Sequence, residues 1–149
     1  MVHISLSVEV KASQSSVFEY FTNWTRQSEW MLGTHVEITN PHLDPQGQSV
    51  GSEIAAFTGF GRLGFLDTMR ITFIEKPFRV DVVHLGKVVR GTGTMLVEAT
   101  SENTSRFVWS EDLDLPLGAF GRFGFFFVKP LFLAGVKASL NKFARQFEK

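Results

Sequence analysis

The chain has 149 residues, which suits one domain that buries roughly 70% of the surface its unfolded chain would expose. Apolar residues make up 44% and charged residues 20%, which excludes a disordered or collagen-like chain. There is no cysteine and the formal net charge is zero, so we expect neither a zinc–thiolate site nor a nucleic-acid partner. We expect a single cytoplasmic domain, residues 1–149, because no secretory signal pattern opens the sequence.

The first half of the chain predicts one strand, two short helices and then a series of strands. Residues 2–10 alternate apolar and polar side chains, as in a half-buried strand. A serine-rich stretch then offers a helix cap before Phe21, and residues 23–31 predict a second short helix. Short connections make the later strands antiparallel, and we place these strands at residues 35–39, 50–58, 65–75, 78–85, 88–98 and 104–115.

The C-terminal segment predicts one long helix over about residues 119–147. Val136, Leu140, Phe143 and Phe147 recur at helical spacing and form one buried stripe, while Pro130 should kink the helix because it lacks a backbone donor. An antiparallel sheet needs one covered face, and only this helix is long enough to cover it. We therefore expect an α+β fold in which a curved sheet of about seven strands wraps around the helix, with a cavity wherever the two do not meet.

Several segments together resemble the SRPBCC superfamily. They are VFEYFTNWTRQSEWM at 17–31, IEKPFRV at 74–80, the hairpin at 87–113 and ASLNKFARQFE at 138–148. That superfamily includes START lipid-transfer domains and plant pollen-allergen-like proteins, and this chain is most similar to the bacterial polyketide cyclase/dehydrase-type proteins. The resemblance implies a helix-grip fold around a ligand cavity. It implies no shared catalytic motif, because only some members close aromatic polyketide rings.

Strand alternation selects the side chains expected to face this cavity. The sequence has sixteen Phe and one Tyr, and such a Phe-rich interior suits an apolar ligand. Small residues on the inward face of one strand should leave room for that ligand. The expected ligand-binding residues are Trp30, Met69, Phe73, Val82, Gly91, Gly93, Met95, Phe107, Trp109, Phe120, Phe123, Phe127 and Leu131.

Three ionisable residues fall on the same inward faces. Asp67, His84 and Glu111 are therefore candidates for proton transfer beside an apolar cavity. The alternative is that each lies near a strand end and reaches solvent. The four histidines are dispersed and lack metal-ligand spacing, so we expect no metal and no cofactor.

Two similar Gly/Phe segments suggest the mouth of the cavity. Residues 59–64, GFGRLG, match a dinucleotide-binding pattern, but a predicted strand follows them where that chemistry requires a helix. Residues 60–65 and 120–125 agree at five of six positions. Arg62 and Arg122 could therefore meet an acidic or carbonyl group at the mouth, although coincidence in a chain rich in Gly and Phe explains the match equally simply.

These observations favour a protein that binds a small, mainly apolar molecule, polyketide-, aromatic- or lipid-like. The alternatives are a polyketide cyclase or dehydratase acting on a poly-carbonyl chain, and a lipid or quinone chaperone at membranes. The membrane chaperone rests on the Phe-rich helix, whose basic residues would allow contact with a membrane surface. Arg122, Lys129 and Pro130 interrupt this apolar stretch, so we expect no transmembrane segment. Clustered ionisable side chains around a sealed cavity would favour the enzyme, whereas an apolar cavity with Arg only at its mouth would favour the carrier.

Overall fold

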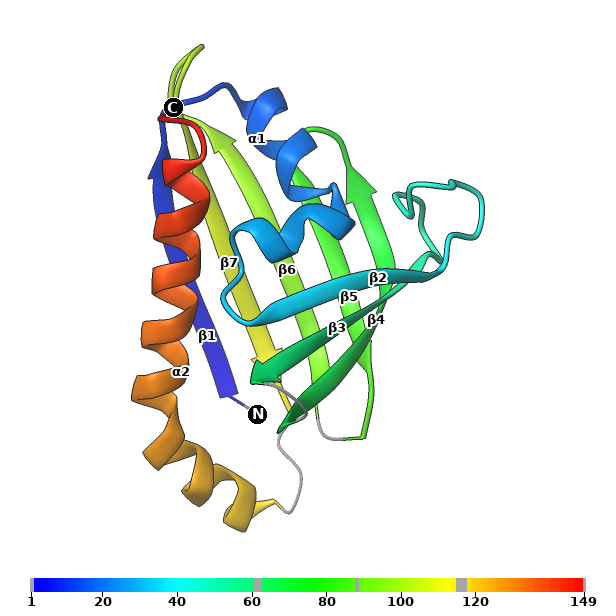
Figure 1. Ribbon diagram of the computed structural model, residues 1–149, viewed down its shortest axis with the longest axis vertical. Coiled ribbons are helices and arrows are strands. Elements are labelled where there is room, and N and C mark those ends of the chain that lie inside the picture. The colour runs from blue at the N-terminus through cyan, green and yellow to red at the C-terminus, as the bar shows by residue number, and fades with distance from the viewer. Residues whose placement is uncertain (1, 61–62, 88, 115–117, 149) are drawn as a thin grey trace.

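The computed structural model describes residues 2–60, 63–87, 89–114 and 118–148. Its seven strands are β1 (Val2–Val10), β2 (Thr34–Asn40), β3 (Glu53–Phe60), β4 (Leu63–Glu75), β5 (Arg79–Leu85), β6 (Arg90–Ala99) and β7 (Ser105–Leu113). They form one antiparallel sheet in the order β1-β7-β6-β5-β4-β3-β2 (Figure 1). All neighbours from β2 to β7 are hairpin partners, and β1 closes the sheet against β7. The predicted fold class is confirmed.

Three helices complete the fold: α1 (Gln14–Phe21), the 3-10 helix η1 (Trp24–Glu29) and α2 (Ala119–Arg145). Ser13 caps α1 as its position predicts, because its side chain accepts a hydrogen bond from the Ser16 backbone amide. Figure 1 shows α1 and η1 lying across the concave side of the sheet, while α2 runs beside β1. The two short helices do not cover the other end of the concave side. The first half of α2 faces the sheet there.

The second half of α2 belongs to the core. Leu140 and Phe143 are fully buried, and the Phe143 ring packs edge-on against Trp30 and Phe107 with centroid distances of 4.9 and 4.8 Å. Val136 lies partly buried against the same core. The predicted stripe is confirmed in this half of the helix. Figure 1 shows that α2 bends in its first half, where Pro130 lies within it.

Candidate functional site

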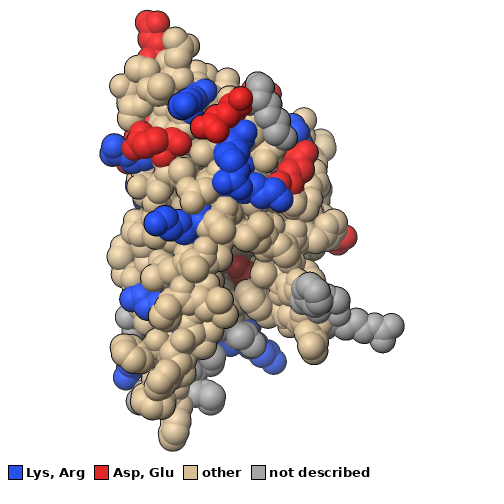
Figure 2. Space-filling model, turned by 60° about the vertical axis from the view of Figure 1, so that its left-hand side comes forward, with Lys and Arg blue, Asp and Glu red and all other residues tan. Residues whose placement is uncertain are grey.

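A cavity of about 680 Å³ lies between the sheet, η1 and the first half of α2. Most of its lining is apolar, and the contributing strands are β2 to β7. The cavity is not sealed, because Phe120 and Leu131 line it and are also 81% and 76% exposed. Figure 2 shows this opening as a hollow in which acidic side-chain atoms are visible. The space suits a small apolar molecule with access from one side.

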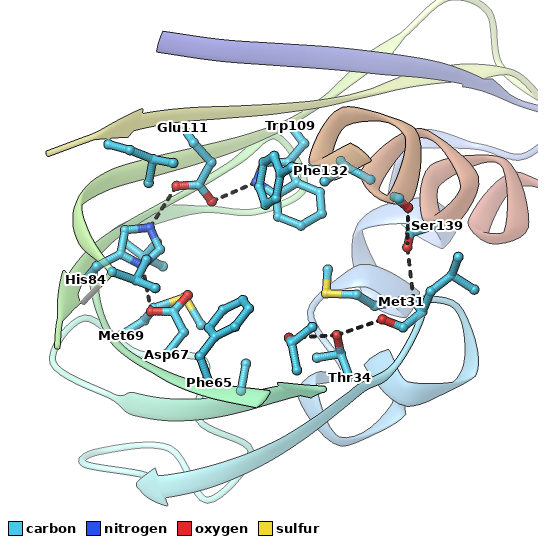
Figure 3. Close-up of a pocket in the computed structure, with 18 of the residues that line it drawn as sticks. Met31, Thr34, Phe65, Asp67, Met69, His84, Trp109, Glu111, Phe132 and Ser139 are labelled. Carbon is cyan, nitrogen blue, oxygen red and sulfur yellow. Dashed lines mark hydrogen bonds and ion pairs between the residues drawn. The ribbon is translucent and has the colours of Figure 1, made fainter. Parts of the chain in front are cut away.

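One end of the cavity holds an ion cluster made of Asp67, His84 and Glu111 (Figure 3). The His84 ring nitrogens lie 2.8 Å from Asp67 Oδ1 and 2.7 Å from Glu111 Oε2. The indole Nε1–H of Trp109 donates to the other Glu111 oxygen, Oε1, at 2.8 Å. The three ionisable candidates from three different strands therefore form one connected group, which the sequence alone did not establish.

Sheet pairing explains how this cluster forms. His84 on β5 lies opposite Met69 of β4 and opposite Gly91 of β6, while Glu111 on β7 lies opposite Gly93 of β6. Only β6 separates the strands that carry His84 and Glu111, and its residue beside the Glu111 carboxylate has no side chain. The imidazole can therefore reach across β6 to Glu111.

The cluster fixes His84 in its charged form. Burial lowers the pKa of His84, but hydrogen bonds to Asp67 and Glu111 and the charges of these two carboxylates raise it, with a net result of about 10. At neutral pH both ring nitrogens are protonated and donate to the carboxylates. The imidazolium therefore lies between the two carboxylates and is hydrogen-bonded to both.

Asp67 is the member of the cluster best placed to meet a ligand. The His84 side chain is only 2% exposed, whereas that of Asp67 is 15% exposed. Oδ2 of Asp67 accepts no hydrogen bond from any described residue, while both Glu111 oxygens accept one. Figure 3 shows the Asp67 carboxylate at the edge of the open space. The cluster therefore presents a free acceptor oxygen to the cavity, and no free N–H donor.

A second polar group lies across the cavity from this cluster. The hydroxyl oxygens of Thr34 and Thr58 are 2.9 Å apart, and Thr34 also donates to the Leu32 carbonyl (Figure 3). Ser139 accepts from the Leu32 amide and donates to a carbonyl within α2. The buried Gln27 side chain lines the cavity, and no described residue hydrogen-bonds to its amide group. The Gln27 amide can therefore donate to a carbonyl oxygen of a ligand.

Eight of the expected ligand-binding residues line the cavity. They are Trp30, Met69, Val82, Met95, Phe107, Trp109, Phe120 and Leu131. Sequence reasoning missed other lining residues, including Gln27, Met31, Thr34, Phe65 and Phe132. Thr34 and Phe65 lie on strands where alternation could have found them. Gln27 lies in η1 and Met31 follows η1, where no period of two applies.

Phe73 lies outside the cavity, contrary to expectation. The β4–β5 register shifts between Ile71 and Phe73, because Ile71 pairs with Val82 while Phe73 pairs with Asp81. This bulge reverses the alternation, so the Phe73 ring is 42% exposed and lies under the Arg79 guanidinium on the outer face.

Phe123 and Phe127 also lie outside the cavity. Each is 67% exposed, and neither is among the residues that line the cavity. A helix that is apolar on every side carries no pattern to show which side faces inward, which is why the expectation was wrong for these two residues.

The two glycines of β6 are not lining residues but serve as spacers. Gly91 has φ +118°, and a Cβ there would lie 2.0 Å from the Asp112 carbonyl oxygen. A Cβ on Gly93 would lie 2.9 Å from Glu111 Oε2. Gly91 therefore permits the close β6–β7 approach, and Gly93 leaves the space that the Glu111 carboxylate occupies rather than space for a ligand.

Of the two arginines expected at the mouth, Arg122 is exposed on α2 and is not among the lining residues, and Arg62 lies outside the described residues. Arg90 and Asp114 line the cavity instead, with a side-chain N–O distance of 3.6 Å. Within the described part of the chain, no group of three His, Cys, Asp or Glu residues is placed to hold a metal ion.

Fold and site together define a helix-grip protein with one open, mainly apolar cavity and a buried ion cluster at its end. The chain belongs to the family described as polyketide cyclase / dehydrase and lipid transport, whose model matches residues 1–148. This membership confirms the resemblance seen in the sequence. A search of curated protein sequences found no significant match.

Solved structures share the fold at low sequence identity. A START superfamily protein from Mycobacterium smegmatis is 10% identical with a TM-score of 0.77, and the match covers 97% of each chain. The Zhui aromatase/cyclase from Streptomyces sp. R1128 is 14% identical with a TM-score of 0.79, covering 99% of this chain and 93% of that one. A norcoclaurine synthase from Thalictrum flavum is 15% identical with a TM-score of 0.65, covering 99% and 96%. Such similarity establishes the fold and leaves the ligand to be argued from the site.

Proposed function

We propose that this protein binds a small, mainly apolar, ring-forming carbonyl compound and moves a proton on it, as a polyketide cyclase or dehydratase does. The observation that supports this function is the ion cluster of Asp67, His84 and Glu111 at the end of an apolar cavity. The family description and the fold shared with an aromatase/cyclase agree with this class of reaction.

Asp67 acts as the catalytic base in this proposal. Its free Oδ2 takes a proton from the carbon beside a substrate carbonyl, the C–H electron pair forms the enolate double bond, and the carbonyl π pair moves to oxygen. The enolate carbon can then attack a second carbonyl of the same molecule and close a ring. The π pair of that carbonyl moves to its oxygen, which takes the proton from Asp67, and the first carbonyl re-forms. The Gln27 amide donates a hydrogen bond to a substrate oxygen at the other end of the cavity, and the apolar walls hold the chain in a folded conformer.

His84 and Glu111 are positioning residues. The His84 imidazolium holds Asp67 by Oδ1 and leaves Oδ2 toward the cavity, and Glu111 holds the opposite ring nitrogen. Trp109 in turn fixes Glu111 through its indole N–H. Because the pKa of His84 is raised to about 10, His84 itself is no base at neutral pH.

Hydrogen–deuterium exchange of a model ketone tests this function without knowledge of the natural substrate. 2-Tetralone, a bicyclic apolar ketone, is dissolved in buffered D₂O and its α-protons are followed by NMR. We expect the wild-type protein to accelerate their exchange and Asp67→Asn to abolish the acceleration. Asp81→Asn is the matched control, because Asp81 pairs with Arg79 on the outer face of the neighbouring strand.

A carrier without chemistry is the second candidate, and the mainly apolar lining favours it. The neutral fluorescent probe N-phenyl-1-naphthylamine measures binding separately from proton transfer. If the wild type binds this probe and 2-tetralone but leaves the exchange rate unchanged, the carrier is correct and the cyclase is not. Retained probe binding in Asp67→Asn together with lost exchange supports the enzyme.

A further inference from the structure

The first half of α2 exposes a continuous set of large apolar side chains, here named the phenylalanine patch. Each member is between 53% and 81% exposed, and the members are Phe120, Phe123, Phe126, Phe127, Val128 and Leu131. Soluble monomers seldom expose so large an apolar area unless something binds there.

These rings contact one another rather than the protein core. Phe127 packs edge-on against Phe123 and Phe126, with centroid distances of 5.1 and 5.6 Å. Phe120, Phe123, Phe127 and Leu131 recur at intervals of three and four residues and share one helix face. Figure 1 shows the end of β3 and the start of β4 toward the same end of the molecule, and Leu63 at the start of β4 is 82% exposed.

Charge indicates what this patch meets. The sequence of α2 contains Arg122, Lys129, Lys137, Lys142 and Arg145, and it contains no Asp or Glu. Figure 2 shows the lower part of the molecule as mainly uncharged, with scattered basic side chains. Aromatic side chains flanked by Arg and Lys suit an anionic lipid surface, where rings enter the headgroup boundary and cations meet phosphates.

The helix can lie on such a surface but cannot cross it. By length and composition residues 120–145 would suffice for a membrane span. Leu140 and Phe143 of the second half are, however, buried in the protein core. Residues 120–131 alone cover about 18 Å at roughly 1.5 Å per residue, less than the roughly 30 Å of a hydrocarbon core.

The patch is continuous with the mouth of the cavity. Phe120, Val128 and Leu131 are exposed and also line the cavity. We infer that the first half of α2 docks on the surface of an anionic lipid bilayer, so that the cavity opens onto the acyl region and an apolar ligand passes between them without crossing water. This inference goes beyond the proposed function and does not depend on it.

Vesicle flotation tests the docking surface. The full-length protein is mixed with vesicles of POPC and POPG at 7:3, or of POPC alone, in 0.1 M NaCl. We expect the wild type to float with the anionic vesicles and to bind POPC vesicles at least tenfold more weakly. The double variant Phe123→Ser/Phe126→Ser should bind vesicles at least tenfold more weakly than the wild type. The double variant Arg122→Glu/Lys129→Glu should bind the anionic vesicles at least tenfold more weakly. Leu43→Ser is the control, because Leu43 is 81% exposed in the β2–β3 loop.

Three results would overturn the inference. The first is a wild type that stays with the soluble fraction. The second is equal flotation with both vesicle types, which would remove the anionic surface as the partner. The third is a wild type that does not float and is a dimer in analytical ultracentrifugation, while Phe123→Ser/Phe126→Ser is a monomer. That result would assign the patch to a second copy of the chain. In lipid-free buffer this variant should retain the thermal stability and the 2-tetralone exchange of the wild type, so failure of docking and failure of the proposed function are distinguishable.

Discussion

The charge state of His84 predicts that the protein loses stability as pH rises. Its folded-state pKa, about 10, lies above the value of about 6.5 expected in the unfolded chain. The stabilisation is therefore fully present below pH 6.5 and is lost as pH rises toward 10. Integrated between pH 6 and pH 9, this difference corresponds to about 3 kcal/mol of unfolding free energy at most.

Urea unfolding at pH 6 and pH 9 measures this loss, and the ¹³Cε1 resonance of His84 measures the titration itself. Asp67→Asn removes one of the two carboxylates, so the pKa of His84 should fall and the stability loss between the two pH values should shrink. Asp81→Asn should leave both unchanged. A His84 midpoint near 6.5 in the wild type, or equal losses in wild type and Asp67→Asn, would refute the ion cluster described here.

Three further perturbations test other parts of the structure. Leu140→Ala should lower the free energy of unfolding, measured with urea, by roughly 2 to 5 kcal/mol because Leu140 is fully buried. The control Leu43→Ala should lower it by almost nothing. A small loss for Leu140→Ala would contradict the packing of α2. Trp109→Ala should weaken N-phenyl-1-naphthylamine binding more than tenfold, and fluorescence titration that finds an unchanged affinity would place the ligand elsewhere. Gly93→Ala should displace the Glu111 carboxylate and shift the Trp109 indole NMR signal while the protein stays folded; an unmoved signal would mean that Gly93 is no spacer.

The fold was predictable because its signals are local. Alternation marked the strands, short turns made them antiparallel, and the stripe of Leu140 and Phe143 marked the core half of α2. The first half of α2 was less predictable. Without a polar face, its sequence does not distinguish Phe120, which lines the cavity, from Phe123, which points to solvent.

The site was predictable residue by residue but not as an arrangement. Alternation placed Asp67, His84 and Glu111 on the inward side, and it worked because the β4 bulge lies beyond Ile71. The same bulge made the expectation for Phe73 wrong, since nothing in the sequence marks one extra residue. Whether the three ionisable groups touch depends on strand register, which only the folded sheet defines.

The ion cluster bears directly on whether this protein is a carrier or an enzyme. Burying an imidazolium and two carboxylates costs desolvation energy, and their mutual attraction offsets this cost only with good geometry. Proteins in which apolar residues of similar size replace such a cluster are often at least as stable. A cavity that only held an apolar molecule would gain nothing from an ion cluster at its end, and the polar groups would weaken its hold on an apolar ring. A proton-transfer site, by contrast, can use an oriented carboxylate beside an apolar substrate. Under the proposed function, the free oxygen of Asp67 is the base, and the hydrogen bonds through His84 to Glu111 orient it.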